Sequence, residues 1–225
     1  MKSRYKSLLL ASLLVSGMAH AELVKTYFKT GELKAETNYV DGTNTPIKEG
    51  IKNGIEKIYY IEGPLAYEVN YINGKRDGKL VWFDKKGVKI AQMYYVDGKL
   101  HGMERSFFKN GRIKHEVMYE NDKKEGFQRE YYDNGRLALE VPYRHNKKEG
   151  IQREYAYDGK LYSEVLYKNN YKEGLQKWYD DKGNVVKTEL FKMDRPVNVM
   201  KKIQEKKPDA TLKISNIDFS PKKPK

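Results

Sequence analysis

The chain has 225 residues, a formal net charge of +13 at pH 7 and no cysteine. Its length fits one or two ordinary domains, and the lack of cysteine excludes disulfides as a source of stability. Residues 193–225 hold nine Lys or Arg against four Asp or Glu, whereas charges of both signs alternate over residues 22–192. A diffuse surplus of this kind indicates a solvated surface or weak attraction to anionic lipid, polysaccharide or nucleic acid.

The first 21 residues have the pattern of a secretory signal peptide. Three cations precede an apolar run from Leu8 to about Val15, and Ala-His-Ala ends the segment. The apolar run is too short to span a bilayer, and no cysteine follows it for lipid attachment. A frayed N-terminal helix is the alternative. We expect an exported protein whose mature chain begins at Glu22 and which is periplasmic, on the cell surface or extracellular.

A 24-residue repeat follows, from residue 22 to residue 192. Glycine stands at what we call repeat position 0 in six copies, and a first copy has Glu22 there. A second glycine stands at position 9, and positions 5 and 17 are aromatic in all seven copies. The glycines at position 0 are Gly54, Gly78, Gly102, Gly126, Gly150 and Gly174. Such repetition predicts units that bury their apolar side chains against their neighbours.

Each copy has the pattern of a β-hairpin. In the copy that begins at Gly126, residues 127–131 and 137–143 alternate as two strands, and Asp133-Asn134-Gly135 has the composition of a tight turn. Gly, Asn or Asp at position 20 predicts a second tight turn between hairpins. The expected fold is therefore all-β, an elongated antiparallel meander of seven 24-residue β-hairpin repeats that form an open sheet, with a short C-terminal cap.

The turn also predicts which residues share a face. If Gly135 closes a three-residue turn, position 5 faces position 11 and position 1 faces position 15. The odd positions of both strands then share one face, which carries Tyr131, Val141 and Tyr143, and the glutamates at position 14 lie on the opposite face. We therefore expect a ribbon whose two faces differ electrically.

Position 3 is cationic in six of the seven copies and shares a predicted face with the aromatic residue at position 5. In one interpretation these cations cover aromatic rings and pair with nearby carboxylates. In the other, a basic-aromatic stripe binds an acidic partner, an anionic lipid surface or a polyanion. The candidate partner-binding residues are Arg105, Arg129, Arg153, Lys177, Tyr131, Tyr155 and Tyr179.

Beyond residue 192 the repeat pattern ends. Residues 197–207 fit a short helix, and residues 211–219 alternate like a strand that covers the last hairpin. The predicted organisation is a signal peptide at 1–21, seven repeats at 22–192 and a basic cap and tail at 193–225.

The repeat does not gather unlike catalytic side chains. His101, His115 and His145 occupy unrelated repeat positions, and no pair of histidines has the helical spacing of a metal site. No serine lies in a G-x-S-x-G motif, and Asp180-Asp181 fits a turn better than a calcium loop. We therefore expect no enzymatic activity, cofactor, metal or small-molecule substrate.

Three phrases resemble the bacterial variant of the MORN repeat: YINGKRDGKLVWFDKKG at 71–87, YVDGKLHGMERSFFKNGRIKHEVMY at 95–119 and YKNNYKEGLQKWYDDKG at 167–183. The resemblance extends over about residues 22–192. It implies a family commonly labelled as the antitoxin component of a toxin–antitoxin system, with relatives among secreted and surface proteins. The classical MORN repeat is linked to membrane-proximal scaffolding and to lipid kinases, but nothing in this chain resembles a kinase domain.

Together these features predict an exported, non-enzymatic repeat protein that mediates protein–protein interaction or scaffolding. Its partner is expected to be another protein, which the sequence does not name. An antitoxin or immunity-type protein that neutralises a partner toxin is one alternative, and a peripheral binder of anionic membrane or polysaccharide is another. Nucleic acid is not an expected partner.

Overall fold

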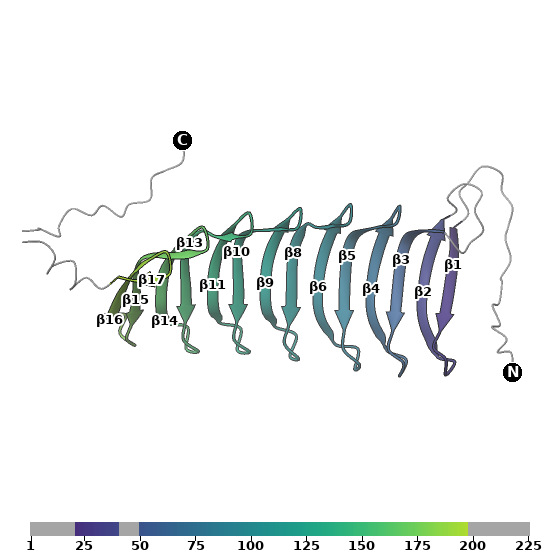
Figure 1. Cartoon of the computed structure of the whole chain (residues 1–225). Helices are drawn as coiled ribbons and strands as arrows, with labels where there is room; N and C mark the ends of the chain where they lie inside the picture. The colour runs from purple at the N-terminus through teal and green to yellow at the C-terminus, as the bar shows by residue number, and fades with distance from the viewer. Residues whose placement is uncertain (1–20, 41–49, 198–225) are drawn as a thin grey trace, which may run out of the picture.

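The computed structural model describes residues 21–40 and 50–197, and over these ranges it contains strands and turns but no helix. Its 17 strands form one antiparallel sheet. Figure 1 shows the hairpins side by side along one axis, from the purple N-terminal end to the yellow-green C-terminal end. The structure confirms the predicted all-β meander of hairpin repeats.

Seven hairpins make up the sheet, and each hairpin pairs with the next along the chain. In the fourth and sixth hairpins the first strand is divided into two segments that pair with the same neighbouring strand. The first three hairpins are β1 (Ala21–Tyr27) with β2 (Leu33–Val40), β3 (Ile51–Tyr59) with β4 (Leu65–Ile72), and β5 (Lys75–Phe83) with β6 (Lys89–Val96). The fourth and fifth are β7 (Lys99–Leu100) and β8 (Gly102–Phe107) with β9 (Ile113–Glu120), and β10 (Lys123–Tyr131) with β11 (Leu137–Arg144). The last two are β12 (Lys147–Lys148) and β13 (Gly150–Tyr155) with β14 (Leu161–Lys168), and β15 (Tyr171–Tyr179) with β16 (Val185–Lys192), after which comes β17 (Arg195–Pro196).

The predicted hairpin turn is present in all seven repeats, and the predicted link turn in the six repeats whose link the structure describes. In the fifth hairpin, Gly135 has φ 88° and its N–H donates to the Tyr132 carbonyl at 2.9 Å, which closes the three-residue turn. In the link after that hairpin, His145 and Asn146 have φ 50° and 67°. Consecutive positive φ values define the tight turn that suits the twist of an antiparallel pair.

Neighbouring link turns are also joined to each other. The N–H of Asn146 donates to the Lys124 carbonyl at 3.1 Å, and the N–H of Lys124 donates to Asn146 Oδ1 at 2.6 Å. The same reciprocal pair recurs one repeat later between Lys148 and Asn170. Asn or Asp at position 20 therefore both adopts the left-handed backbone and fastens one repeat to the next.

A β-bulge in every hairpin makes part of the predicted register wrong. Tyr131 pairs with Leu137 as expected, but Glu130 pairs with Leu139, so that Ala138 at position 12 has no partner across the hairpin. The same shift occurs in all seven hairpins. Position 1 consequently faces position 16 rather than 15, and position 3 faces position 14. A bulge bends its strand, and the second strands β2, β4, β6, β9 and β11 are visibly bowed (Figure 1).

The corrected register defines the two faces of the sheet. Residues directly opposite each other share a face, and successive residues alternate. What we call the ladder face carries positions 1, 3, 5, 11, 14 and 16, and the tyrosine face carries positions 2, 4, 13, 15 and 17. Val141 and Tyr143 therefore lie on the face opposite to Tyr131, and the glutamates at position 14 share the face of the position 3 cations. The expectation of two electrically different faces was wrong because it took no account of the bulge.

The tyrosine face holds most of the buried apolar side chains. Val117, Val141 and Val165, all at position 15, are at most 3% exposed. Beside them the Nζ of Lys148 lies 4.6 Å from the centre of the Tyr167 ring and donates to Gln152 at 3.2 Å. Equivalent Lys–aromatic pairs in neighbouring repeats extend this packing along the sheet. Buried valines, together with the aromatic rings of position 17 and the lysines beside them, thus form the shared core.

The strands of the described residues run from β1, which begins at Ala21, to β16, which ends at Lys192, and the short β17 follows. The predicted division of the chain into 1–21, 22–192 and 193–225 stays a prediction. The signal peptide, the helix expected from residue 197 and the strand expected at 211–219 lie almost entirely outside the described residues. Those expectations stay predictions.

Candidate interaction surface

Across the ladder face runs a continuous series of ion pairs. Its members, which we call the ion-pair ladder, are Arg105, Glu116, Arg129, Glu140, Arg153, Glu164 and Lys177. Within its own hairpin, Arg129 Nε donates to Glu140 Oε2 at 2.9 Å, and Arg129 Nη1 lies 3.9 Å from Glu116 Oε1 of the preceding hairpin. Arg153 Nη1 lies 3.8 Å from the other oxygen of Glu140. Each carboxylate therefore contacts cations from two hairpins and couples them electrostatically.

Tyrosines at position 5 donate hydrogen bonds to the carboxylates of the ladder. Tyr131 donates its hydroxyl to Glu116 at 2.7 Å, and Tyr179 does the same to Glu164 at 2.7 Å. Burial and then the bond to Glu116 raise the pKa of Tyr131 to about 12. Burial pushes the pKa of Glu116 up, but hydrogen bonds from Tyr131 and Arg105 and nearby cations bring it below its usual value. The carboxylate of Glu116 therefore stays charged at neutral pH.

The structure brings the predicted stripe residues together on one face, but the cations are not free. Arg105, Arg129, Arg153 and Lys177 each lie near at least one ladder carboxylate. Tyr155 is half-buried in the same row as Tyr131 and Tyr179. The interpretation in which the cations pair with nearby carboxylates is confirmed by these contacts. Binding of a partner by the same residues stays a prediction.

Beside the ladder lies a row of exposed apolar side chains that the predicted register had not placed. Positions 1 and 16 face each other across each hairpin, and in the last four repeats both are apolar. We call these residues the apolar row: Met103, Met118, Phe127, Pro142, Ile151, Leu166, Leu175 and Leu190. Five of them, Met118, Phe127, Ile151, Leu166 and Leu175, are 39–43% exposed. With eight strands about 4.8 Å apart, the row is roughly 34 Å long.

The first three repeats do not continue this row. Ile55, at position 1 of the second repeat, is 44% exposed but faces Asn70, and Lys79 faces Tyr94 in the third repeat. Asn70 Nδ2 donates to the Asp77 carbonyl at 2.9 Å, so this polar residue has a structural use in the backbone bend. Scattered apolar residues are ordinary on a surface, whereas a contiguous strip marks a candidate interaction site.

Exposed cations border the apolar row on the side away from the ladder. Positions 18 and 21 lie next to the link turns and on the ladder face, because position 18 is two residues beyond position 16. In the last four repeats the cations there, which we call the cationic rim, are Lys123, Arg144, Lys147, Lys168, Lys192 and Arg195. Glu120 is the carboxylate among positions 18 and 21. Between the row and the rim lie the half-buried glutamates of position 23, which accept hydrogen bonds from the backbone N–H groups of link turns at 2.8–3.2 Å: Glu125, Glu149 and Glu173. Their charges are engaged by these bonds, whereas the rim beyond them exposes positive charge.

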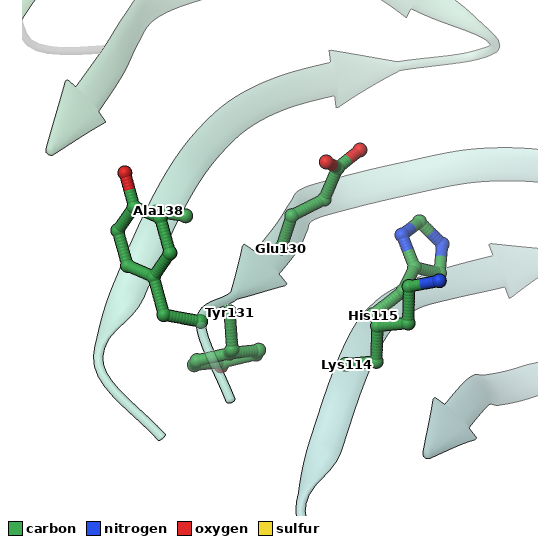
Figure 2. A pocket seen from close by; sticks show the side chains of 6 residues that line it. Lys114, His115, Glu130, Tyr131 and Ala138 are labelled. Atoms are coloured by element: carbon green, nitrogen blue, oxygen red, sulfur yellow. The ribbon is translucent and has the colours of Figure 1, made fainter. Parts of the chain in front are cut away.

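A shallow hollow lies near the middle of the sheet. It is lined by Lys114, His115, Glu130, Tyr131, Tyr132 and Ala138. Figure 2 shows that these side chains come from neighbouring strands and that Tyr131 points away from His115 and Glu130. No nucleophile with an adjacent base is gathered there, so the hollow does not have the arrangement of a catalytic site.

Over residues 21–40 and 50–197, no group of three or more His, Cys, Asp or Glu side chains is arranged to hold a metal ion. The same part of the chain contains no helix long and apolar enough to cross a membrane.

Sequence comparison matches five of the seven hairpins to a family of repeats. The MORN repeat variant matches residues 23–41, 100–121, 124–145, 148–169 and 172–193. These five segments are MORN repeat variants. They correspond to the first hairpin and the last four, and the last four MORN repeats are those that carry the apolar row. The second and third hairpins lie outside the matched segments, although they have the same register and bulge as the MORN repeats.

Other comparisons add little about function. One solved structure, titled "Crystal Structure of TarM", is similar to this chain at 17% identity with a TM-score of 0.30. The similarity covers 42% of this chain and 20% of the TarM chain. No curated protein matches the chain. MORN repeats in general mediate binding to proteins or membranes, and these comparisons do not identify a partner.

Proposed function

We propose that this chain is an exported, non-enzymatic repeat protein that binds another protein through the ladder face of its last four MORN repeats. The observation that carries the proposal is the apolar row, whose most exposed members include Phe127, Ile151 and Leu175. Exposed apolar strips of this kind lose water favourably when a partner covers them. The general role of MORN repeats in protein or membrane binding supports the same conclusion.

The predicted stripe residues belong to the proposed surface as its inner border. Side chains of Arg105, Arg129, Arg153 and Lys177 are 33–41% exposed, whereas the ladder carboxylates are 10–18% exposed. A partner that approaches the ladder face therefore meets guanidinium and ammonium groups before it meets carboxylates. The ladder holds these groups in fixed positions, which lowers the entropy cost of using them in an interface.

The site supports binding rather than catalysis. The surface repeats like groups along one axis, and the hollow at His115 and Glu130 lacks a paired nucleophile and base. A scaffold needs an extended surface that keeps its shape, and nearest-neighbour stacking of hairpins supplies one. The proposed export rests on the N-terminal sequence pattern of residues 1–21.

Affinity purification from the envelope and medium fractions of the native host tests this proposal. The wild-type chain is compared with an Ile151→Ser/Leu175→Ser variant and with the matched control Ile55→Ser, which changes a residue of similar exposure outside the row. A protein recovered with wild type and with the control, but lost with the double variant, supports the proposal. Recovery that is equal for all three chains contradicts it, as does recovery from the cytoplasmic fraction alone.

The same experiment separates the alternatives. An antitoxin or immunity-type protein would be recovered with a toxin, and its deletion would be lethal when that toxin is present. A peripheral binder of anionic membrane or polysaccharide would bind vesicles or glycans without any protein, and that binding would weaken steeply with added salt.

A further inference from the structure

The chemistry of the ladder face narrows the class of partner, if the proposed protein-binding function holds. The apolar row is one side chain wide, because each strand contributes one residue to it, and the ladder and the cationic rim lie on its two sides. We propose that this surface binds an acidic amphipathic segment of another protein, with apolar side chains on the row and carboxylates on the two borders. Positive borders around an apolar centre favour negative borders around an apolar centre in the partner.

The two borders differ in how available their charge is. The inner border is the ladder, in which Arg129 and Arg153 already contact carboxylates but keep 35% of their side-chain surface exposed. Because these guanidinium groups are already paired, they should attract an acidic partner only weakly. Their fixed positions should instead help to orient the partner on the surface. The outer border is the cationic rim, where Arg144, Lys147 and Lys168 are exposed. Charge reversal at the rim is therefore the sharper way to test for an acidic partner.

A second copy of the chain fits this surface poorly. Two ladder faces packed against each other would place cationic rim and ladder guanidinium groups against their own kind. The row itself, about 34 Å long and one side chain or about 7 Å wide, offers roughly 230 Å², against the roughly 800 Å² per partner of a stable interface. A narrow strip suits a single extended or helical segment, as in other peptide-binding grooves.

A lipid surface also fits less well than a polypeptide. The five most exposed row residues are only 39–43% exposed and the other three are half-buried, so the row does not project far from its surroundings. The Arg and Lys side chains on both borders are longer than Ile151 or Leu166 and would meet lipid headgroups first. The row would then stay outside the hydrocarbon, where its apolar surface gains nothing from burial.

Selection of peptides by the folded protein tests the proposal directly. The probe is a phage-displayed library of random peptides, which is selected against the immobilised chain. Each peptide has about 12 residues, enough to span the row when the peptide is extended. Selected sequences are expected to combine apolar residues with Asp or Glu. Their affinity should fall at least about tenfold in Ile151→Ser/Leu175→Ser and in Lys147→Glu/Lys168→Glu, as for the loss of central or charged interface contacts.

Two controls keep the result specific. Ile55→Ser leaves the row intact. Lys109→Glu/Lys182→Glu makes the same change in net charge in hairpin turns, which lie at the opposite end of the strands from the link turns. Both controls should bind the selected peptides as wild type does, and all variants should show the wild-type circular dichroism spectrum. Selected peptides without acidic enrichment, an empty selection, or peptides that bind the row variants unchanged would overturn the proposal. Row-dependent binding to phosphatidylglycerol vesicles in place of peptides would assign the surface to lipid instead.

These outcomes are distinguishable from a failure of the proposed function. If purification from the host recovers a row-dependent protein but the selected peptides are not acidic, the protein-binding function stands and the partner chemistry is wrong. If neither experiment depends on the row, both proposals fail.

Discussion

Arg129 of β10 lies directly opposite Glu140 of β11, and its Nε donates to Glu140 Oε2 at 2.9 Å. This pairing exists because of the bulge at Ala138. If the same sequence paired without a bulge, Arg129 would lie opposite Leu139, and Glu140 would point to the other face of the sheet. The bulge at position 12 therefore places cations and carboxylates on one face, and the ladder is a consequence of it.

The carboxylate of Glu116 should matter for stability because three donors surround it. It accepts from Tyr131 at 2.7 Å and from Arg105 at 3.1 Å, and Arg129 lies 3.9 Å away. We expect Glu116→Ala to lower the free energy of unfolding by about 2 kcal/mol, since it leaves these partly buried groups without their acceptor. Urea unfolding followed by circular dichroism measures the change.

Glu120→Ala is the matched control for that variant. Glu120 lies on the same strand but is exposed, so its loss should change the stability by no more than about 0.5 kcal/mol. Equal effects of the two substitutions would show that the ladder adds no stability.

Two glycines at the same repeat position should differ in their tolerance of a side chain. Gly150 has φ 121°, and a Cβ there would approach Pro142 Cγ to 3.0 Å, whereas Gly126 has φ 71° and nothing within 4 Å of such a Cβ. Gly126→Ala should cost about 1 kcal/mol from backbone strain alone, and Gly150→Ala about 2–3 kcal/mol, because a clash is added to a more strained backbone. Thermal unfolding of both variants tests the order, and a smaller loss for Gly150→Ala would contradict it.

The link turns should depend on the side chain of Asn146 as well as on its backbone. Asn146→Gly keeps the left-handed conformation but removes the oxygen that accepts from the Lys124 N–H at 2.6 Å. Asn146→Ala removes the oxygen and adds strain. We expect losses of about 1 kcal/mol for the glycine variant and about 2 kcal/mol for the alanine variant. Hydrogen exchange of the Lys124 amide, faster in both variants than in wild type, locates the effect.

The hairpins could be predicted because residue types that favour tight turns recur at fixed positions of the repeat. Glycine at position 9 and Gly, Asn or Asp at position 20 require positive φ, and the structure has positive φ at both in every described copy. The bulge could not be predicted from position 12 itself, where Lys, Ala, Ile, Tyr and Val all occur. A bulged residue faces no partner across the hairpin, so no side-chain type is selected there.

A signal for the corrected register was nevertheless present. The third repeat is the copy in which position 3 is not cationic, and its Val81 pairs with Gln92 where five other copies have glutamate at position 14. The loss of both charges in one copy fits a contact between the two positions, although the last copy keeps Lys177 opposite Thr188. The apolar row, by contrast, mixes Met, Phe, Pro, Ile and Leu and becomes visible only when positions 1 and 16 are known to be opposite.

The pKa shifts at the ladder predict how stability depends on pH. The pKa values of Glu116 and Glu164 lie below their usual value because hydrogen bonds and cations outweigh burial. Each carboxylate therefore contributes stability that is present above its unfolded pKa of about 4.3 and is lost as the pH falls through its lower folded pKa. The free energy of unfolding should stay level from about pH 7 to 5 and fall below about pH 4. Glu116→Gln should show a shallower fall.

At alkaline pH the tyrosines should make the protein less stable as the pH rises. Burial, followed by the bonds to Glu36, Glu116 and Glu164, raises the pKa values of Tyr59, Tyr131 and Tyr179 to about 12. Because these folded pKa values exceed the unfolded value of about 10, the stability that they contribute is present below about pH 10 and is lost as the pH rises toward 12. Ultraviolet titration of tyrosinate should resolve a late group of ionisations, and Tyr131→Phe should remove one member of that group. A late group that is unchanged in Tyr131→Phe would mean that the hydroxyl of Tyr131 is not held by Glu116.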